Sequence, residues 1–228
     1  MPRCDDIAQK IKHLKGELGS TNLIAVTKYT TIEDAILTYQ AEQFDLGENK
    51  VVDLKTRASY FSKNKYNNVR WHYIGHLQTN KVRDLLKIPN LYAIHSVDSL
   101  RLIEEMLKHQ ASFQGEELNI FLQVNTSQED SKSGFETMDD LEKAIEVLLH
   151  THSPFKLKGL MTMGTVKTEN FAEEAKRCFT ELVKIKNYIQ NKFTLIDLKL
   201  SMGMSQDYQI AKELGADYVR IGSLIFKM

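Results

Sequence analysis

Cysteine and proline are scarce in this chain of 228 residues. The two cysteines, Cys4 and Cys178, stand far apart and outside any Cys-x-x-Cys spacing. They therefore support neither a disulfide framework nor a zinc site. The three prolines, at positions 2, 89 and 154, leave no proline-rich linker, and no stretch is of low complexity. These absences favour a single domain that spans residues 1–228.

An excess of charge of either sign is absent as well. Thirty basic and thirty acidic residues give a formal net charge of zero, which argues against a broad nucleic-acid footprint or attraction to anionic membranes. No apolar run approaches the roughly 20 residues of a membrane span. Residues 1–17 are charged and resemble no secretory signal. We therefore expect a cytoplasmic protein with no nucleic-acid or membrane partner.

Strand-like and helix-like stretches alternate along the chain. The predicted strands cover residues 22–27, 44–47, 71–74, 91–95, 118–125, 157–161, 195–199 and 217–221. The predicted helices cover residues 4–18, 32–41, 48–60, 79–87, 99–110, 138–150, 170–191 and 205–214. The count of eight strands favours an α/β fold of the closed (β/α)8 TIM-barrel type over an open doubly wound sheet. The helix at 4–18 is then an extra N-terminal helix.

Lys28 closes the first predicted strand, and nothing about a strand end requires a lysine. The run Leu23-Ile24-Ala25-Val26-Thr27 before it is typical of a buried parallel strand. Ligand sites of α/β proteins lie at the carboxyl ends of such strands. A lysine there can form a Schiff base with a carbonyl compound. The alternative is a solvated lysine that starts a loop.

The ends of the seventh and eighth predicted strands carry small, donor-rich sequences. Ser201 and Met202 belong to the segment LSMGMS, and Gly222 and Ser223 follow the last strand. Loops at these two positions of a barrel often bind phosphate through backbone N–H groups. Each segment alone is also compatible with an ordinary turn. Together, and next to Lys28 in a closed barrel, they predict an anion site.

Arg220 lies within the apolar strand DYVRI, where a guanidinium needs a partner or a cavity. One interpretation is an ion pair with an acidic side chain at the barrel mouth, such as Glu48. The other is a donor to a ring nitrogen of a bound heterocycle. A donor that cannot deprotonate would keep a pyridine nitrogen unprotonated and weaken the ring as an electron sink.

A metal site has little support. His72 and His76 are four residues apart, but a strand end lies between them, and no third ligand with suitable spacing is visible. No Ser-His-Asp or Cys-His set can be argued from residue order alone. We therefore predict no metal site.

The sequence resembles the YggS/PROSC family of pyridoxal phosphate homeostasis proteins. The segments that carry the resemblance run through nearly the whole chain in the family's order: AVTK (25–28), GEN (47–49), WHYIGHLQTNK (71–81), IHSVDS (94–99), QVNTSQEDSKSG (123–134), GLMTMG (159–164), LSMGMSQDY (200–208) and VRIGSLIF (219–226). Departures from the family pattern occur at Leu46, at Tyr29-Thr30 and in the terminal sequence IFKM.

The resemblance implies a barrel like the N-terminal domain of alanine racemase, the fold type III barrel, without the C-terminal β domain. It also implies pyridoxal 5′-phosphate as cofactor, with Lys28 as the Schiff-base lysine. Arg220 matches the residue that faces the pyridine nitrogen, and Asn49 matches a residue beside the ring. Phosphate-binding loops are matched by the four residues Ser201, Met202, Gly222 and Ser223.

By this resemblance the protein would buffer or deliver pyridoxal phosphate in vitamin B6 homeostasis, without a catalytic residue, as a monomer whose partners include apoenzymes that accept the cofactor. Racemases of this fold carry a further domain with a catalytic tyrosine, whereas only five residues follow Ser223 here. The alternatives are a PLP-dependent amino-acid racemase, a phosphate-sugar aldolase in which Lys28 attacks a substrate carbonyl, and a purely structural role.

Overall fold

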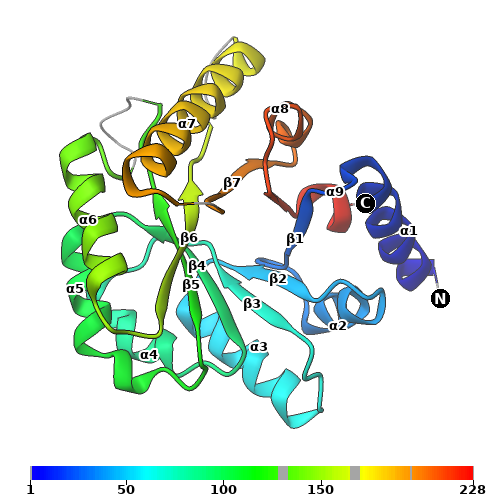
Figure 1. Cartoon of the computed structure of the whole chain (residues 1–228). Coiled ribbons are helices and arrows are strands. Elements are labelled where there is room, and N and C mark those ends of the chain that lie inside the picture. The colour runs from blue at the N-terminus through cyan, green and yellow to red at the C-terminus, as the bar shows by residue number, and fades with distance from the viewer. Residues whose placement is uncertain (1, 128–132, 165–169, 196, 228) are drawn as a thin grey trace.

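Eight parallel strands close into a barrel in the order of the sequence, from β1 to β8 (Figure 1). The computed structural model describes residues 2–127, 133–164, 170–195 and 197–227. The strands are β1 (Asn22–Val26), β2 (Asp45–Glu48), β3 (Arg70–Tyr73), β4 (Leu91–Val97), β5 (Leu118–Gln123), β6 (Phe155–Met161), β7 (Lys199–Met204) and β8 (Tyr218–Ile221). β8 pairs with β1, with Arg220 beside Ile24, and this pairing closes the barrel. The predicted fold class is confirmed.

Helices alternate with the strands and surround the barrel (Figure 1). The α-helices are α1 (Pro2–Leu18), α2 (Ile32–Gln40), α3 (Val51–Lys63), α4 (Val82–Leu86), α5 (Leu100–Lys108), α6 (Met138–His150), α7 (Phe171–Phe193), α8 (Tyr208–Glu213) and α9 (Ser223–Phe226). Two 3-10 turns, η1 (Thr79–Lys81) and η2 (Gln110–Ser112), complete the described elements. The predicted extra N-terminal helix corresponds to α1, which packs against α2 and α9. No helix in the described part of the chain is long and apolar enough to cross a membrane.

Several helices begin where the sequence supplies a capping hydroxyl. The side chains of Thr31, Ser99 and Thr137 accept hydrogen bonds from backbone N–H groups in the first turns of α2, α5 and α6. These bonds satisfy donors that a helix start otherwise leaves unpaired. The starts of α2, α5 and α6 are therefore determined by the local sequence.

Two apolar clusters lie on opposite faces of the strands. The larger cluster fills the layer between the barrel and its helices, with Trp71, Leu46 and Phe61 among its fully buried members. The smaller one, of Ala93, Phe121 and Met161, is separate from it. Successive side chains of a strand point to opposite faces, so the smaller cluster and the buried polar residues of the same parity occupy the barrel interior.

One predicted strand is misplaced. The seventh strand is predicted at 195–199, but β7 runs from Lys199 to Met204, and residue 196 lies outside the described residues. The small residues of the segment LSMGMS are typical of a turn. Gly203 has a φ of 93°, and the pairing of β7 with β8 shifts between Ser201 and Met204. The glycine therefore belongs to an irregular strand end and not to a turn after the strand.

Close contact between β6 and β7 depends on Gly159. A Cβ atom at this position would lie 2.1 Å from the carbonyl oxygen of Lys199, which is its pairing neighbour. We expect Gly159→Ala to lower the free energy of unfolding by about 2 kcal/mol, as overpacking in a core does.

Gly16→Ala is the matched control for this prediction. Gly16 lies inside α1, and a Cβ atom there would meet nothing within 4 Å. Urea unfolding should show a gain of up to about 1 kcal/mol from the helix propensity of alanine. Equal effects of the two substitutions would contradict the close approach of β6 and β7.

Candidate functional site

The barrel mouth holds a cavity of about 300 Å³ at the carboxyl ends of the strands, here called the mouth cavity. Its volume lies at the lower end of the range of small-molecule sites. Three of its described lining residues are ionisable, Lys28, Asp207 and Arg220. The others are Val26, Ile74, Met163, Phe171, Met204, Ser205, Gln206, Gly222 and Ser223. Four of the seven predicted site residues therefore line this cavity: Lys28, Arg220, Gly222 and Ser223.

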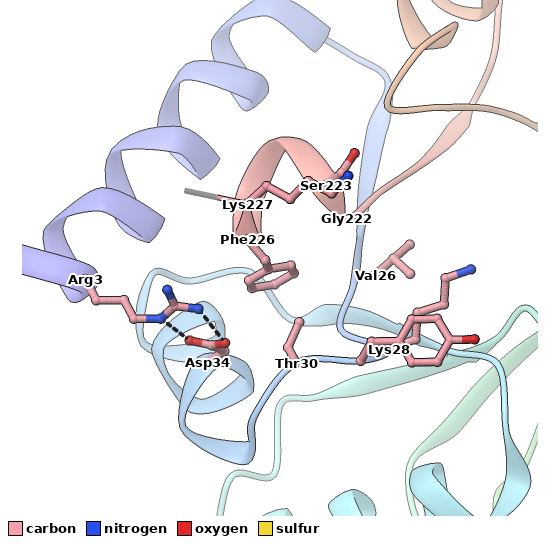
Figure 2. A pocket seen from close by; sticks show the side chains of 10 residues that line it. Arg3, Val26, Lys28, Thr30, Asp34, Gly222, Ser223, Phe226 and Lys227 are labelled. Carbon is pink, nitrogen blue, oxygen red and sulfur yellow. Dashed lines mark hydrogen bonds and ion pairs between the residues drawn. The ribbon is translucent and has the colours of Figure 1, made fainter.

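A second cavity, of about 320 Å³, adjoins the first and is here called the side cavity (Figure 2). Both cavities share Val26, Lys28, Gly222 and Ser223 as lining residues. On its far side, the ion pair between Arg3 of α1 and Asp34 of α2 closes the side cavity, with an Nε–Oδ1 distance of 2.6 Å. Lys28 thus stands at the junction of two chambers.

Lys28 comes two residues after the end of β1, and its side chain points away from the Arg3–Asp34 pair in Figure 2. Its Nζ lies 5.8 Å from the centre of the ring of Tyr29, and Nζ of Lys50 lies 5.7 Å from the same ring. Tyr29 has a φ of 64° and is 78% exposed. A bulky residue in the left-handed region is uncommon and costs energy. The residue directly after Lys28 therefore has a strained backbone and an exposed aromatic side chain.

Arg220 is buried in the wall of the mouth cavity. Its Nη1 donates to the carbonyl oxygen and to Oγ of Ser201, at 2.9 and 2.8 Å, and its Nη2 donates to the carbonyl oxygen of Thr162 at 3.0 Å. Burial lowers the pKa of Arg220 to about 10, while the charge of Asp207 acts in the opposite direction. The guanidinium is therefore still a cation at neutral pH.

The ion pair of Arg220 with Glu48 that the sequence left open is wrong. Glu48 is instead paired with Arg57 of α3 at 3.0 Å and accepts a hydrogen bond from Thr27. Burial raises the pKa of Glu48. The charged partner that does face Arg220 is Asp207, whose Oδ1 accepts from the backbone N–H of Met204. Asp207 is buried, and burial raises the pKa of its carboxyl group as well.

Gly222 and Ser223 stand where β8 gives way to α9. A Cβ atom at Gly222 would lie 2.9 Å from the carbonyl oxygen of Val26, so the absence of a side chain lets the ends of β1 and β8 approach. The hydroxyls of Ser223 and Ser205 both belong to the lining of the mouth cavity. Two strand ends therefore each contribute a serine to the lining of one cavity, and the anion site stays a prediction.

Ser201 and Met202 lie inside β7 and are fully buried. The described lining from this strand end consists of Met204, Ser205, Gln206 and Asp207. The side chain of Ser201 instead faces the barrel interior, where it joins a chain of polar groups. The assignment of Ser201 and Met202 to phosphate binding stays a prediction, and the structure adds Ser205 and Gln206 as candidates.

Asn49 follows β2 and is partly buried, but its Oδ1 atom is fully buried and has no hydrogen-bond partner among the described residues. Its carbonyl group packs on Gly75, where a Cβ atom would lie 2.0 Å from the oxygen. Gly75 directly follows Ile74, a residue of the mouth cavity. Buried amide oxygens are normally satisfied, but Asn49 lines neither cavity in the described residues, so its place beside a ligand stays a prediction.

A row of hydrogen-bonded polar side chains, which no sequence pattern predicts, crosses the barrel interior. Oδ1 of Asp45 is 2.9 Å from Nε2 of His72, and Nδ1 of His72 is 2.9 Å from Nε2 of His95. Nδ1 of His95 is 2.8 Å from Oγ of Ser201, which Arg220 also contacts. These five residues, here called the interior chain, occupy the inward-facing positions of their strands.

His72 and His76 do not meet. His72 is fully buried, whereas His76 is exposed outside the barrel interior with its Nδ1 3.2 Å from Asp98. The described residues include no group of three or more His, Cys, Asp or Glu side chains that could hold a metal ion.

Comparisons with known proteins point to one family. Residues 3–228 match the family model described as alanine racemase, N-terminal domain. The "Pyridoxal phosphate homeostasis protein" of Helicobacter pylori strain 26695 is 37% identical over 206 residues, which cover 90% of this chain and 86% of that protein. The protein of the same name from Schizosaccharomyces pombe is 33% identical over 204 residues, with 90% and 82% of the two chains covered.

A solved structure with the same fold carries the cofactor. PipY from Synechococcus elongatus PCC7942, described with PLP bound, has a TM-score of 0.84 against this chain and 28% sequence identity. The match covers 96% of this chain and 99% of that one.

The ionisation of Asp45, the last member of the interior chain, should make the stability of the protein depend on pH in the acid range. Burial alone would raise the pKa of Asp45, but hydrogen bonds from His72 and Arg70 outweigh it and hold the pKa at about 2, against an ordinary value of 3.8. The stabilisation from this carboxylate, about 2 kcal/mol, is therefore present above pH 3.8 and is lost as the pH falls through about 2.

Asp45→Asn should accordingly be less stable than the wild type at pH 6, and the difference should shrink steadily between pH 4 and pH 2. Urea unfolding at a series of pH values measures it. A difference that stays constant down to pH 2 would contradict the depressed pKa.

Proposed function

The chain belongs to the family of pyridoxal phosphate homeostasis proteins, whose fold is the alanine racemase N-terminal domain, and we propose that it binds pyridoxal 5′-phosphate in the mouth cavity and buffers or delivers it. The observation that carries this proposal is the convergence of Lys28, Arg220 and the hydroxyls of Ser205 and Ser223 on one cavity. An amine, a fixed cation and hydroxyl donors match the aldehyde, the ring nitrogen and the phosphate of this cofactor in turn. Bound pyridoxal phosphate supplies a reactive aldehyde and an electron-withdrawing ring.

Lys28 is the amine that would hold the aldehyde as a Schiff base. It is the one lysine among the described residues that line the mouth cavity. Its position past the end of β1 gives the long side chain room to reach into either chamber. The side cavity would then give amines and acceptor proteins a route to the same nitrogen from the other direction.

Arg220 would face the ring nitrogen. Three of the five N–H donors of its guanidinium are engaged by Ser201 and Thr162. The remaining two have no described partner and can point to a ligand in the mouth cavity. A cationic arginine can donate a hydrogen bond but cannot accept one, so it holds the ring nitrogen unprotonated. The ring is then a weak electron sink, which favours storage over catalysis at the amino-acid α-carbon.

The phosphate would lie against the ends of β7 and β8. Gly222 allows close backbone approach, and the first N–H groups of α9 have no acceptor within the helix. Ser205 and Ser223 add hydroxyl donors. Asn49, which the family resemblance places beside the ring, lines neither cavity in the described residues, and its contact with the ring stays part of this proposal. The backbone of Ser201 and Met202 stays part of this proposal.

Racemisation needs acid–base groups on both faces of the ring. Besides Lys28 and Arg220, the described lining of the mouth cavity contains one ionisable side chain, Asp207. Burial raises the pKa of Asp207, and its Oδ1 accepts from a backbone N–H, so this carboxyl is anchored to the wall. This arrangement supports a carrier more than a racemase.

Four further aspects of the function stay predictions: acceptor apoenzymes as partners, the monomeric state, the cytoplasmic location and the treatment of residues 1–228 as a single domain.

Lys28→Ala tests the proposal. The wild type mixed with pyridoxal phosphate should show a visible absorption band, and borohydride reduction should add the cofactor mass to the peptide that contains Lys28. The variant should lose both and keep weaker binding through the phosphate donors. Complete loss of binding would contradict the anion site. A colourless wild type would favour the aldolase alternative.

Lys50→Ala is the matched control. Nζ of Lys50 lies as close to the ring of Tyr29 as Nζ of Lys28 does, but Lys50 does not line the mouth cavity in the described residues. Its variant should keep the band and the mass label. If the label moved to Lys50 or vanished with it, the assignment of Lys28 would be wrong.

Proton exchange at the amino-acid α-carbon separates carrier from racemase. With the loaded protein and alanine in deuterated water, we expect exchange over hours, because the ring nitrogen is unprotonated. Proton NMR of the alanine α-hydrogen measures it. Turnover on the timescale of seconds would establish an enzyme and overturn the carrier assignment.

A further inference from the structure

The hydrogens of the interior chain can be assigned one by one. Asp45 is ionised and can only accept, so Nε2 of His72 carries the hydrogen of that bond. Burial lowers the pKa of both histidines, and Asp45 offsets part of this effect for His72 only, so both rings are neutral at pH 7. Nδ1 of His72 must then accept from Nε2 of His95.

The same reasoning continues to the barrel mouth. With its hydrogen on Nε2, His95 has an unprotonated Nδ1 that accepts from the hydroxyl of Ser201. The oxygen of Ser201 is then oriented to accept from Nη1 of Arg220, a group that only donates. Each of these four hydrogen bonds is therefore donated in one direction, from Arg220 towards Asp45.

From this chain we infer that His72 and His95 are positioning residues for the cofactor site: through Ser201 they fix the guanidinium of Arg220 so that its two uncommitted N–H donors face the mouth cavity. This inference rests on the proposed function. Neither histidine lines the mouth cavity in the described residues, so both act through Arg220.

The interior chain extends from one end of the barrel to the other. Asp45 is the first residue of β2 and is bound by Arg70, the first residue of β3, so the far end of the chain is anchored at the amino-terminal end of the barrel. Arg220 sits close to the opposite end of β8. Hydrogen bonds of 2.8 to 2.9 Å connect the two ends through fully buried groups. In such surroundings a broken link leaves an unpaired polar group, which is costly.

Two variants of His95 separate positioning from bulk. His95→Met cuts the chain while it fills the space, whereas His95→Gln keeps one amide donor and one acceptor. We expect His95→Met to bind pyridoxal phosphate roughly tenfold more weakly, as for loss of a hydrogen bond to a charged group. Its visible band should move in the same direction as the band of Arg220→Gln, a reference variant that removes the cation proposed to face the ring nitrogen. His95→Gln should restore at least part of both properties.

Phe121→Leu is the matched packing control. The ring of Phe121 stacks on His95 with centres 4.3 Å apart, but it takes no part in the hydrogen bonds. This variant should lose stability and keep the wild-type band and affinity. If it shifted the band as far as His95→Met does, ordinary packing would explain the effect and the inference would fall.

Two further measurements keep the inference testable if His95→Met does not fold. Nitrogen-15 NMR of the cofactor-free wild type should show both His72 and His95 neutral with the hydrogen on Nε2, and an Nδ1–H form of either would overturn the chain. His72→Met and His72→Gln form a second pair, with the same expected contrast in band position and affinity.

The outcomes distinguish this inference from the proposed function. A wild type that never develops a visible band contradicts the proposed function, whatever the NMR shows. The other outcome is that the wild type develops the band and that His95→Met and His72→Met keep the same band position and the same affinity for pyridoxal phosphate. This outcome overturns the role of His72 and His95 and leaves the proposed function standing.

Discussion

The buried charge of Arg220 is the constraint on which the rest of the site depends. A guanidinium inside a barrel needs acceptors and a nearby opposite charge to compensate its burial, because an uncompensated buried charge costs several kcal/mol. Ser201 and Thr162 supply three acceptors from the interior wall, and Asp207 supplies a nearby carboxyl group. Further polar groups must in turn orient Ser201, and these extend across the barrel to Asp45. The polar interior and the candidate site are therefore connected, because Arg220 belongs to both.

The closed barrel brings together residues that are distant in the sequence. Lys28 and Arg220 are almost a full chain length apart, but β1 and β8 pair directly, and the two residues line one cavity. The strand ends supply flexible or small groups at the mouth, whereas the strands themselves supply rigid, fully buried groups below it. This division suits the proposed carrier role: Lys28 lines both cavities, while Arg220, which we propose faces the ring nitrogen, is held by Ser201 and Thr162.

Much of the fold was predictable from the sequence because strand and helix periodicities are local. Seven strands and most helices were predicted near their observed positions, but β7 was displaced. Its residues Ser201 and Gly203 resemble a turn, and only tertiary pairing shows that they form a strand.

Lys28, Gly222 and Ser223 were predictable as strand-end residues. The links of His72 to Asp45 and His95 were not, because they join three strands through side chains and leave no spacing pattern in the sequence. The partner of Glu48 was missed for the same reason, since Arg57 lies on a neighbouring helix.

A crystal structure of the protein grown with pyridoxal 5′-phosphate tests the central claim most directly. Electron density should run continuously from Nζ of Lys28 into a ring in the mouth cavity, with the ring nitrogen within hydrogen-bond distance of Arg220 and the phosphate against Ser205 and Ser223. Density on another lysine, or a ring whose nitrogen faces away from Arg220, would contradict the account.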